Sequence, residues 1–202
     1  MKPLILVSGK QGSGKTTLIT ELRKQRKVAT VKFADPLYEM HEFILNKMQT
    51  WTGEPRIVKD GALLQLLGTE WGRKHRGDNV WVDICKKKID LLRQASLAEI
   101  IAIDDCRFEN EFDAFPDALT VRLECPEEVR KQRMEHGWRD NTSHASETGL
   151  DKYAKDGKFD LVIPTDRISA RESAKLILEA LEVKPIVLVK GEANGEGLPK
   201  PK

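Results

Sequence analysis

Apolar runs alternate along the chain with stretches in which apolar residues recur every three or four positions. Short continuous runs are typical of parallel strands buried on both faces, and the periodic stretches are typical of amphipathic helices. Continuous runs lie at residues 4–7, 100–103 and 161–163, while residues 28–33 have strand propensity and residues 119–123 alternate apolar with polar side chains, which also indicates a strand. They predict an α/β fold with a five-stranded, doubly wound parallel sheet flanked by helices, in which ligands bind at the carboxyl ends of the strands.

The long segment between the second and third of these strands has the pattern of several helices. It begins with Asp35 and Pro36, an N-cap followed by proline at the first helical position, and its apolar stripe continues to Met48. A polar loop containing Gly and Pro ends this helix. Further helices are expected at 63–71 and 80–92, separated by a basic turn. Residues from about 36 to 97 are therefore predicted to form a helical insertion.

The C-terminal part divides into a last helix and an extension. Ser169 and Glu172 form a capping-box pattern, which predicts the start of a helix. Residues 1–184 are expected to form a single domain. Residues 185–189 are apolar enough for a sixth strand or an ordered extension, whereas 191–202 contain mainly Gly, Pro, Lys and Glu. Most of the extension 185–202 is therefore expected to be disordered.

The chain carries a P-loop pattern, G-x-x-x-x-G-K-[ST], in the sequence Gly9-Lys10-Gln11-Gly12-Ser13-Gly14-Lys15-Thr16. It follows a predicted strand and opens a predicted helix, which is the setting that the motif requires. Its glycines let backbone N–H groups turn toward a phosphate, and the helix N-terminus favours the negative charge. Lys15 adds a positive charge, and the Thr16 hydroxyl is suited to hold Mg²⁺. The phosphates of ATP are expected to contact Gly12, Ser13, Gly14, Lys15, Thr16 and Thr17.

Composition and charge mainly exclude classes of partner and site. The 202 residues are 40% hydrophobic and 33% charged, as in one soluble globular domain. Lys and Arg number 34 against 32 Asp and Glu, and a net charge of +2 argues against nucleic acid or an anionic membrane as partner. Cys85, Cys106 and Cys125 are too few and too scattered for a disulfide framework or a zinc site. With no apolar stretch near the roughly 20 residues of a membrane span and no signal peptide, the cytoplasm is the expected location.

Acidic residues follow the third predicted strand. Asp104 and Asp105 end an apolar run, where P-loop proteins place the acid that holds Mg²⁺ through its water shell. The sequence does not decide which of the two holds the metal, and the pair could equally cap the next turn. An evident water-activating group and an Asn-Lys-x-Asp guanine-reading segment are both missing, which argues against a hydrolytic ATPase and a GTPase.

The arginines outside the P-loop fit the transfer of a phosphoryl group to a nucleoside monophosphate. The acceptor phosphate is already largely dianionic at pH 7, so cations and alignment matter more than a base. Arg107 follows the acidic pair, and Arg73 lies in the insertion; both are expected on the acceptor side. Further catalytic cations are expected in a mobile lid, at Arg130, Arg133 and Arg139.

Two features of the lid region stay open. Arg130 and Arg133 are three residues apart and share a helix face, but Glu127 and Lys131 could pair there and make it an ordinary solvated face. His144 and Glu147 lie in a polar stretch that either contacts a base or caps a short helix. The segment from about 126 to 150 is expected to be the lid.

Four segments in order along residues 3–182 resemble the phage-type deoxynucleoside monophosphate kinases. Together with the P-loop they form a strong joint signal, although only the P-loop is specific by itself. The segments are Phe33-Ala34-Asp35-Pro36-Leu37, Leu64-Gln65-Leu66-Leu67-Gly68-Thr69-Glu70-Trp71-Gly72-Arg73, Asp105-Cys106-Arg107-Phe108-Glu109-Asn110-Glu111 and His144-Ala145-Ser146-Glu147.

The resemblance implies a P-loop nucleoside monophosphate kinase fold, ATP with Mg²⁺ as donor and a dNMP as acceptor, giving dNDP and ADP. Trp71 is open between stacking on a base and burial in the core. A phage-encoded protein in a host cytoplasm is consistent with the resemblance, and the oligomeric state is open, a homodimer being one option. The residues implied or expected to face the dNMP are Asp35, Gln65, Trp71, Arg73, Arg107, His144 and Glu147.

Two other functions remain as alternatives. Dephospho-coenzyme A kinase shares the general layout, and because its acceptor is a sugar hydroxyl, Asp35 would then be a candidate general base. A P-loop ATPase or binding module acting on nucleic acid would use the basic residues 73–76 and 86–88. ATP consumption that depends on dNMP, or on DNA or RNA, distinguishes the kinase from the nucleic-acid module.

Overall fold

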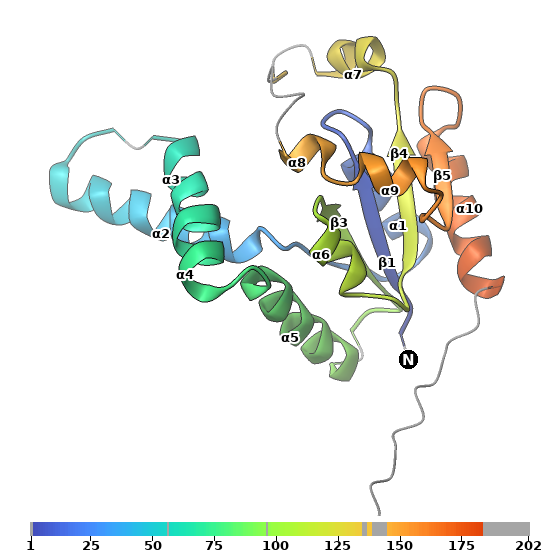
Figure 1. Ribbon diagram of the computed structural model, residues 1–202, viewed down its shortest axis with the longest axis horizontal. Helices are drawn as coiled ribbons and strands as arrows, with labels where there is room; N and C mark the ends of the chain where they lie inside the picture. Colours follow the sequence, from blue (N-terminus) through green and yellow to red (C-terminus); the bar gives the residue numbers. More distant parts are fainter. Residues whose placement is uncertain (1, 56, 96, 135–136, 139–144, 184–202) are drawn as a thin grey trace, which may run out of the picture.

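A parallel sheet with helices on both faces forms the centre of the molecule, as Figure 1 shows for a computed structural model. The structure describes residues 2–55, 57–95, 97–134, 137–138 and 145–183. All neighbouring strands run parallel, in the order β2-β3-β1-β4-β5. This confirms the predicted five-stranded sheet. The strands are β1 (Leu4–Gly9), β2 (Val28–Val31), β3 (Ile100–Cys106), β4 (Leu119–Glu124) and β5 (Leu161–Pro164).

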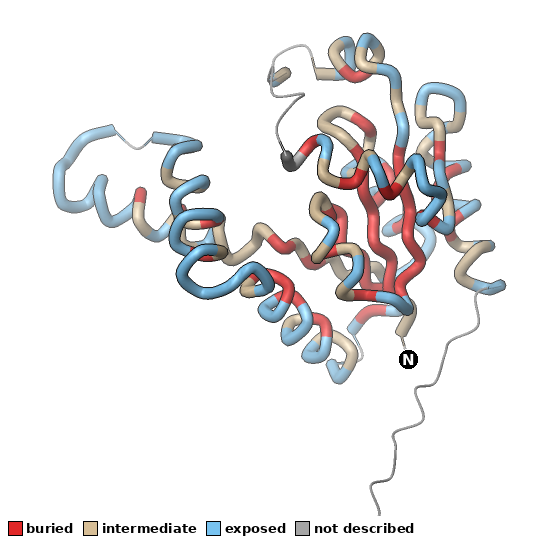
Figure 2. The backbone as a smooth tube through the Cα atoms, in the orientation of Figure 1, coloured by how far each residue is buried: buried red, intermediate tan, exposed pale blue. Residues whose placement is uncertain are grey.

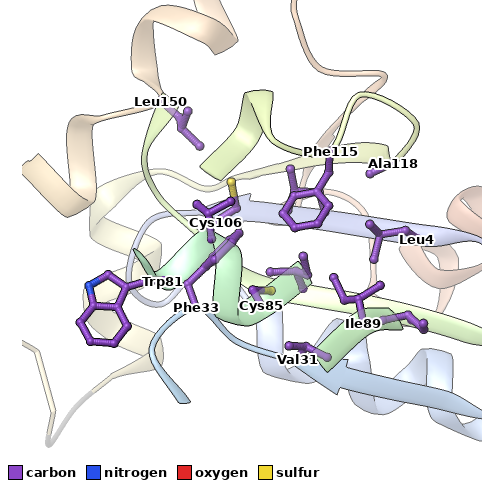
Figure 3. Close-up of a cluster of buried hydrophobic side chains, with 14 of the residues drawn as sticks. Leu4, Val31, Phe33, Trp81, Cys85, Ile89, Cys106, Phe115, Ala118 and Leu150 are labelled. Atoms are coloured by element: carbon purple, nitrogen blue, oxygen red, sulfur yellow. The ribbon is translucent and has the colours of Figure 1, made fainter. Parts of the chain in front are cut away.

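Both faces of the sheet are covered, which is why the central strands β1 and β3 are almost wholly buried and mainly apolar. On β1, Ile5 and Val7 pack toward α1 (Lys15–Gln25) and α10 (Ala170–Val183). Leu4 and Leu6 pack on the other face with Trp81 and other residues of the core in Figure 3. That second face is covered by α5 (Val80–Gln94), α6 (Glu109–Asp113) and α9 (Asp151–Lys155), while α7 (Glu127–Arg133) and α8 (Ala145–Thr148) lie near the carboxyl ends of the strands.

The predicted helical insertion extends to one side of the sheet, and Figure 2 shows that its outer part is largely exposed. Its first helix ends where Gly53 adopts a left-handed φ of 70°. Before α5, it comprises α2 (Asp35–Thr52), α3 (Gly61–Gln65), the π-helix η1 (Leu66–Arg73) and α4 (Lys74–Arg76). In the described part of the chain, no helix is long and apolar enough to cross a bilayer.

The π-helix corrects the expectation for Trp71, which is neither buried nor turned toward the acceptor cavity described below. Its side chain is 45% exposed, because the inward face of η1 consists of Gly68 and Gly72. A Cβ on Gly72 would lie 2.2 Å from the ring of Trp81, whose Nε1 donates to the carbonyl oxygen of Gly68 at 3.0 Å. Trp81 therefore fills the buried position, and the two glycines let it approach the helix backbone.

Asp35 also differs from expectation. Ala34 is the N-cap, so Asp35 is the first residue of the helix and not its cap. Its Oδ2 instead accepts from the backbone N–H of Lys32 at 3.2 Å and from Lys88 Nζ at 2.9 Å. Asp35 therefore ties the end of β2 to α5. The predicted capping box is confirmed, since Ser169 and Glu172 exchange side-chain-to-backbone hydrogen bonds of 3.0 and 3.2 Å.

Candidate active site

The P-loop joins β1 to α1 in the conformation that its glycines require. Gly12 and Gly14 have φ values of 75° and 95°, which other residues rarely adopt. A Cβ on Gly12 would also lie 3.0 Å from the carbonyl oxygen of Arg130, so α7 packs directly against the loop. Thr16 and Thr17 are exposed in the first turn of α1, which carries no acidic residue. The free N-terminus of this helix is therefore suited to an anion.

Lys15 points back into the loop. Its Nζ donates to the carbonyl oxygens of Gly9 and Lys10, which take the place of the phosphate oxygens that a P-loop lysine binds. Burial, followed by the positive charge of Arg107, lowers the pKa of Lys15 from 10.5 to about 8. A nearby anion would stabilise this ammonium group, so the site favours a negatively charged ligand.

The two acidic residues at the end of β3 have different surroundings. Both oxygens of Asp105 accept backbone hydrogen bonds of 3.0 Å, from Phe33 and Ala34, and burial raises the pKa of this carboxyl to about 6. Asp104 is 7% exposed; its Oδ2 lies 3.6 Å from Lys32 Nζ, and its Oδ1 has no hydrogen-bond partner among the described residues. A carboxylate oxygen is a ligand that Mg²⁺ or its water shell accepts. Asp104 therefore fits the metal role better than Asp105.

A cavity of about 640 Å³ opens between the P-loop, the ends of β2 and β3, and the insertion. It is large enough for a nucleotide-sized ligand. Lys15 and Thr16 contribute to its wall together with other charged and polar side chains, and the remaining lining residues are aromatic or apolar. Gln65 is not among its lining residues, and neither are Trp71 and Asp35. The lining includes Gln11, Lys32, Phe33, Leu37, Tyr38, Lys59, Leu64, Thr69, Arg73, Asp104, Asp105, Arg107, Phe108, Glu111 and Glu147.

Two arginines expected to meet the acceptor phosphate, Arg73 and Arg107, both line this cavity. Nη2 of Arg73 donates to Glu111 Oε1 at 3.0 Å, and its guanidinium lies 4.5 Å from the centre of the Phe108 ring. Nη1 of Arg107 donates to Glu147 Oε1 at 2.6 Å. The two cations come from different elements, yet buried carboxylates bring them to one cavity.

Glu111 had no role assigned from sequence. Its Oε2 accepts from the backbone N–H groups of Arg107 and Phe108 at 2.8 and 3.1 Å, so it fixes the chain after β3 while holding Arg73. Burial is the main reason that its pKa rises to about 7. The available signal was a glutamate three residues after a helix start, as in a capping box.

Glu147 lies between the cavity and the P-loop. Its Oε2 accepts from the backbone N–H of Gln11 at 2.8 Å, while Oε1 accepts from Arg107. Burial opposes its ionisation, but these two donors outweigh it and lower the pKa of Glu147. The sequence left two roles open for Glu147, contact with a base or capping of a short helix. In the structure its carboxylate instead joins Arg107 to the P-loop. His144, the other candidate of this motif, lies outside the described residues.

The arginines of α7 bind other parts of the chain here. Arg130 is 5% exposed, so the solvated-face interpretation is wrong for it; Nη1 donates to the carbonyl oxygen of Gln11 at 3.0 Å. Arg133 donates to Oγ1 and O of Thr165, at 3.1 and 2.7 Å. The predicted Glu127–Lys131 ion pair is confirmed at 2.8 Å. Arg139 lies outside the described residues.

A second cavity, of about 660 Å³, adjoins the P-loop on its other side. Its wall is formed by the first turn of α1, the start of α10 and Arg133. The P-loop therefore separates two spaces, one toward the insertion and one toward α10. Ser13, Lys15 and Thr16 are positioned to contact a phosphate chain passing between them.

Comparison with known proteins agrees with this architecture. The model of the AAA domain family matches residues 5–151. A protein from Thermus thermophilus has a TM-score of 0.59 at 15% identity, covering 90% of this chain and 96% of its own. The Deinococcus radiodurans tunicamycin resistance protein gives 0.55 at 15%, covering 90% and 96%, and a sugar kinase from a Janibacter species gives 0.50 at 17%, covering 92% and 97%. No curated protein sequence matches.

At these identities the solved structures establish the fold alone, a five-stranded P-loop kinase-like fold. The family match covers most of the sheet and both the P-loop and the acidic end of β3. The chain therefore belongs to the AAA domain family of P-loop proteins.

Proposed function

We propose that the protein transfers the γ-phosphoryl group of ATP to a deoxynucleoside monophosphate, giving dNDP and ADP. The observation that carries the proposal is the single cavity in which Lys15 and Asp104 meet two arginines, Arg73 and Arg107. Such a set neutralises a donor phosphate at one end and a dianionic acceptor phosphate at the other. Phosphoryl transfer to a phosphate needs this alignment and charge, but no base.

Each end of the site has a distinct task. The P-loop holds the donor phosphates, and we assign the second cavity, beside Arg133, to the adenosine part. Thr16 and Asp104 would hold Mg²⁺, which would neutralise negative charge on the donor phosphates. On the acceptor side, Arg107 and Arg73 hold the phosphate, and the aromatic wall with Phe108 accommodates the base. An acceptor phosphate oxygen then bonds to the γ-phosphorus as the bond to the ADP oxygen breaks.

The proposed lid runs from about 126 to 150, and its described part begins with α7. Arg130 and Arg133 would reach the phosphates only by exchanging their present partners, Gln11 and Thr165. We therefore propose that lid closure and nucleotide binding are coupled. The helical insertion is proposed to bind the acceptor, and the cytoplasm, where ATP is available, is the proposed location.

The surroundings of Asp35 favour this reaction over transfer to a sugar hydroxyl. A general base would have to reach the attacking hydroxyl. Asp35 is instead paired with Lys88 and is not among the residues that line the cavity. The dephospho-coenzyme A kinase alternative therefore loses its proposed base.

The decisive experiment is an assay of ADP formation with ATP, Mg²⁺ and each of the four dNMPs and four NMPs. We expect ATP consumption to require a nucleoside monophosphate, with dNMPs preferred. Consumption that is independent of all eight, or that is stimulated by DNA or RNA, would contradict the proposal. Mass spectrometry of the products identifies the acceptor phosphorylated.

The metal assignment gives a separate prediction. Asp104→Asn should lower kcat about 10²-fold and raise the Mg²⁺ concentration needed for activity, because it removes the unpaired carboxylate oxygen. It should not lower Tm, since that oxygen makes no hydrogen bond within the described chain. Asp105→Asn is the matched control: it should lower Tm through its two backbone hydrogen bonds and leave the Mg²⁺ requirement nearly unchanged. The reverse pattern would transfer the metal to Asp105.

A further inference from the structure

A buried arginine that has no role in the proposed catalysis lies on β4. Arg122 is 5% exposed, and its neighbour in the parallel register is Ser8 on β1. Nη1 donates to Ser8 Oγ at 3.1 Å, and Nη2 donates to Asp151 Oδ1 at 2.6 Å. A guanidinium inside a sheet is costly and is tolerated only when its partners are well placed. This one has a carboxylate partner at the start of α9.

The same carboxylate reaches the P-loop. Asp151 Oδ2 accepts from Lys10 Nζ at 2.8 Å, so one aspartate joins Arg122 of the sheet to the second residue of the loop. The carbonyl oxygen of Lys10 in turn accepts from the backbone N–H of Ser13 and from Lys15 Nζ, both at 3.1 Å. Fixing Lys10 therefore fixes the carbonyl acceptor that closes the loop turn through the N–H of Ser13.

The helix that carries Asp151 is firmly anchored. Leu150 and Tyr153 are 1% and 6% exposed within the core, and the Tyr153 hydroxyl donates to Asp113 Oδ2 at 2.8 Å. Figure 1 shows α9 crossing the sheet beside β1 and β4. The adjoining cavity, of about 620 Å³, is lined by both cations and carboxylates, and Asp151 pairs with Lys10 and Arg122 there. Because these charges already pair with one another, the cluster is better suited to hold the structure together than to bind a second ligand.

We propose that Asp151 and Arg122 are positioning residues that hold the P-loop, through Lys10, in its phosphate-binding conformation. A loop that is already ordered loses less conformational entropy when phosphate binds, so this link strengthens donor binding. The inference rests on the proposed nucleotide site at the P-loop but not on the identity of the acceptor.

Binding of ADP with Mg²⁺ to the full-length protein, measured by calorimetry, tests the proposal. Asp151→Asn and Lys10→Met should each weaken ADP binding about tenfold, the scale of one lost charge-assisted hydrogen bond. The double variant should bind no worse than either single variant, because both break the same link. Lys10→Arg, which keeps the ion pair, should retain most of the affinity.

Asp160→Asn is the matched structural control. Asp160 Oδ2 accepts from the backbone N–H and Oγ1 of Thr120, both at 2.8 Å, near the opposite end of β4 from the P-loop. This variant should lower Tm without changing the dissociation constant for ADP. If Asp151→Asn does not fold, Lys10→Met carries the test, because it leaves the Arg122–Asp151 pair in place.

Three results would overturn an assignment. Unchanged ADP binding in Lys10→Met and Asp151→Asn would remove the positioning role while leaving the proposed function standing. Fully additive losses in the double variant would make Lys10 a direct phosphate ligand and would overturn the link through Asp151. Absence of ADP binding by the wild-type protein would instead refute the nucleotide site itself, and with it both proposals.

Discussion

Lys15→Ala is expected to abolish phosphoryl transfer, with kcat reduced at least about 10³-fold. The ammonium group belongs to the P-loop, where the donor phosphates are proposed to bind, and its present partners are two loop carbonyls that a phosphate would replace. Its charge acts on the developing negative charge in the transition state, so binding of ADP should weaken less than kcat falls. Steady-state kinetics with dNMP and titration with ADP measure the two effects separately.

The fold should survive this substitution, and pH gives a control. Burial lowers the pKa of Lys15 to about 8 in the folded protein. Below that pH the lysine is charged in both states, and burying the charge reduces the free energy of unfolding. The wild-type protein therefore gains stability from this residue as the pH rises from about 8 toward 10.5, and the alanine variant does not. Tm of the variant should be equal to or above the wild-type value at pH 7, with the difference narrowing at pH 9. Near-normal turnover of the folded variant would refute the nucleotide site.

The sheet could be predicted from sequence because its physical signal is local. The central strands β1 and β3 are buried on both faces, so their apolar runs are nearly continuous, whereas β2 and β5 are partly exposed and β4 alternates apolar with polar residues. The P-loop is equally local, since its glycines and its lysine lie within eight residues of one another. Such features need no knowledge of which distant segments meet.

The features that could not be predicted depend on contacts between segments that are distant in the sequence. Trp81, and not Trp71, fills the buried position beside the π-helix, because this helix presents Gly68 and Gly72 inward to the Trp81 ring. Helical spacing alone could not reveal that packing.

The partners of charged residues were hidden for the same reason. Gln11 and Glu147 are 136 residues apart in the chain, yet they share a hydrogen bond. The sequence identified arginines for the acceptor side and Glu147 as a candidate, but it revealed neither the pairing of Glu147 with Arg107 nor any role for Glu111. A pattern of residue types predicts which charges a site needs; the fold decides which carboxylate holds each one.

Arg107→Ala should lower kcat/KM for the acceptor about 10²-fold or more, because its guanidinium is the proposed partner of the acceptor phosphate. In the structure this group is paired with Glu147, which also accepts from the P-loop amide of Gln11. Removing the arginine leaves a buried carboxylate beside the P-loop with one cation fewer. Some loss of ATP affinity is therefore expected from repulsion between Glu147 and the phosphates, even if Arg107 contacts only the acceptor.

A double variant separates these two effects. Combining Arg107→Ala with Glu147→Gln removes the unpaired negative charge, so ATP affinity should return to near the wild-type level while the acceptor defect persists. The single Glu147→Gln variant is the control for any independent effect of the carboxylate on the loop. If the double variant still binds ATP as weakly as Arg107→Ala, the arginine belongs to the donor side. If acceptor kcat/KM recovers together with ATP affinity, Arg107 acts only by neutralising Glu147, and the acceptor phosphate must be held by other cations, beginning with Arg73.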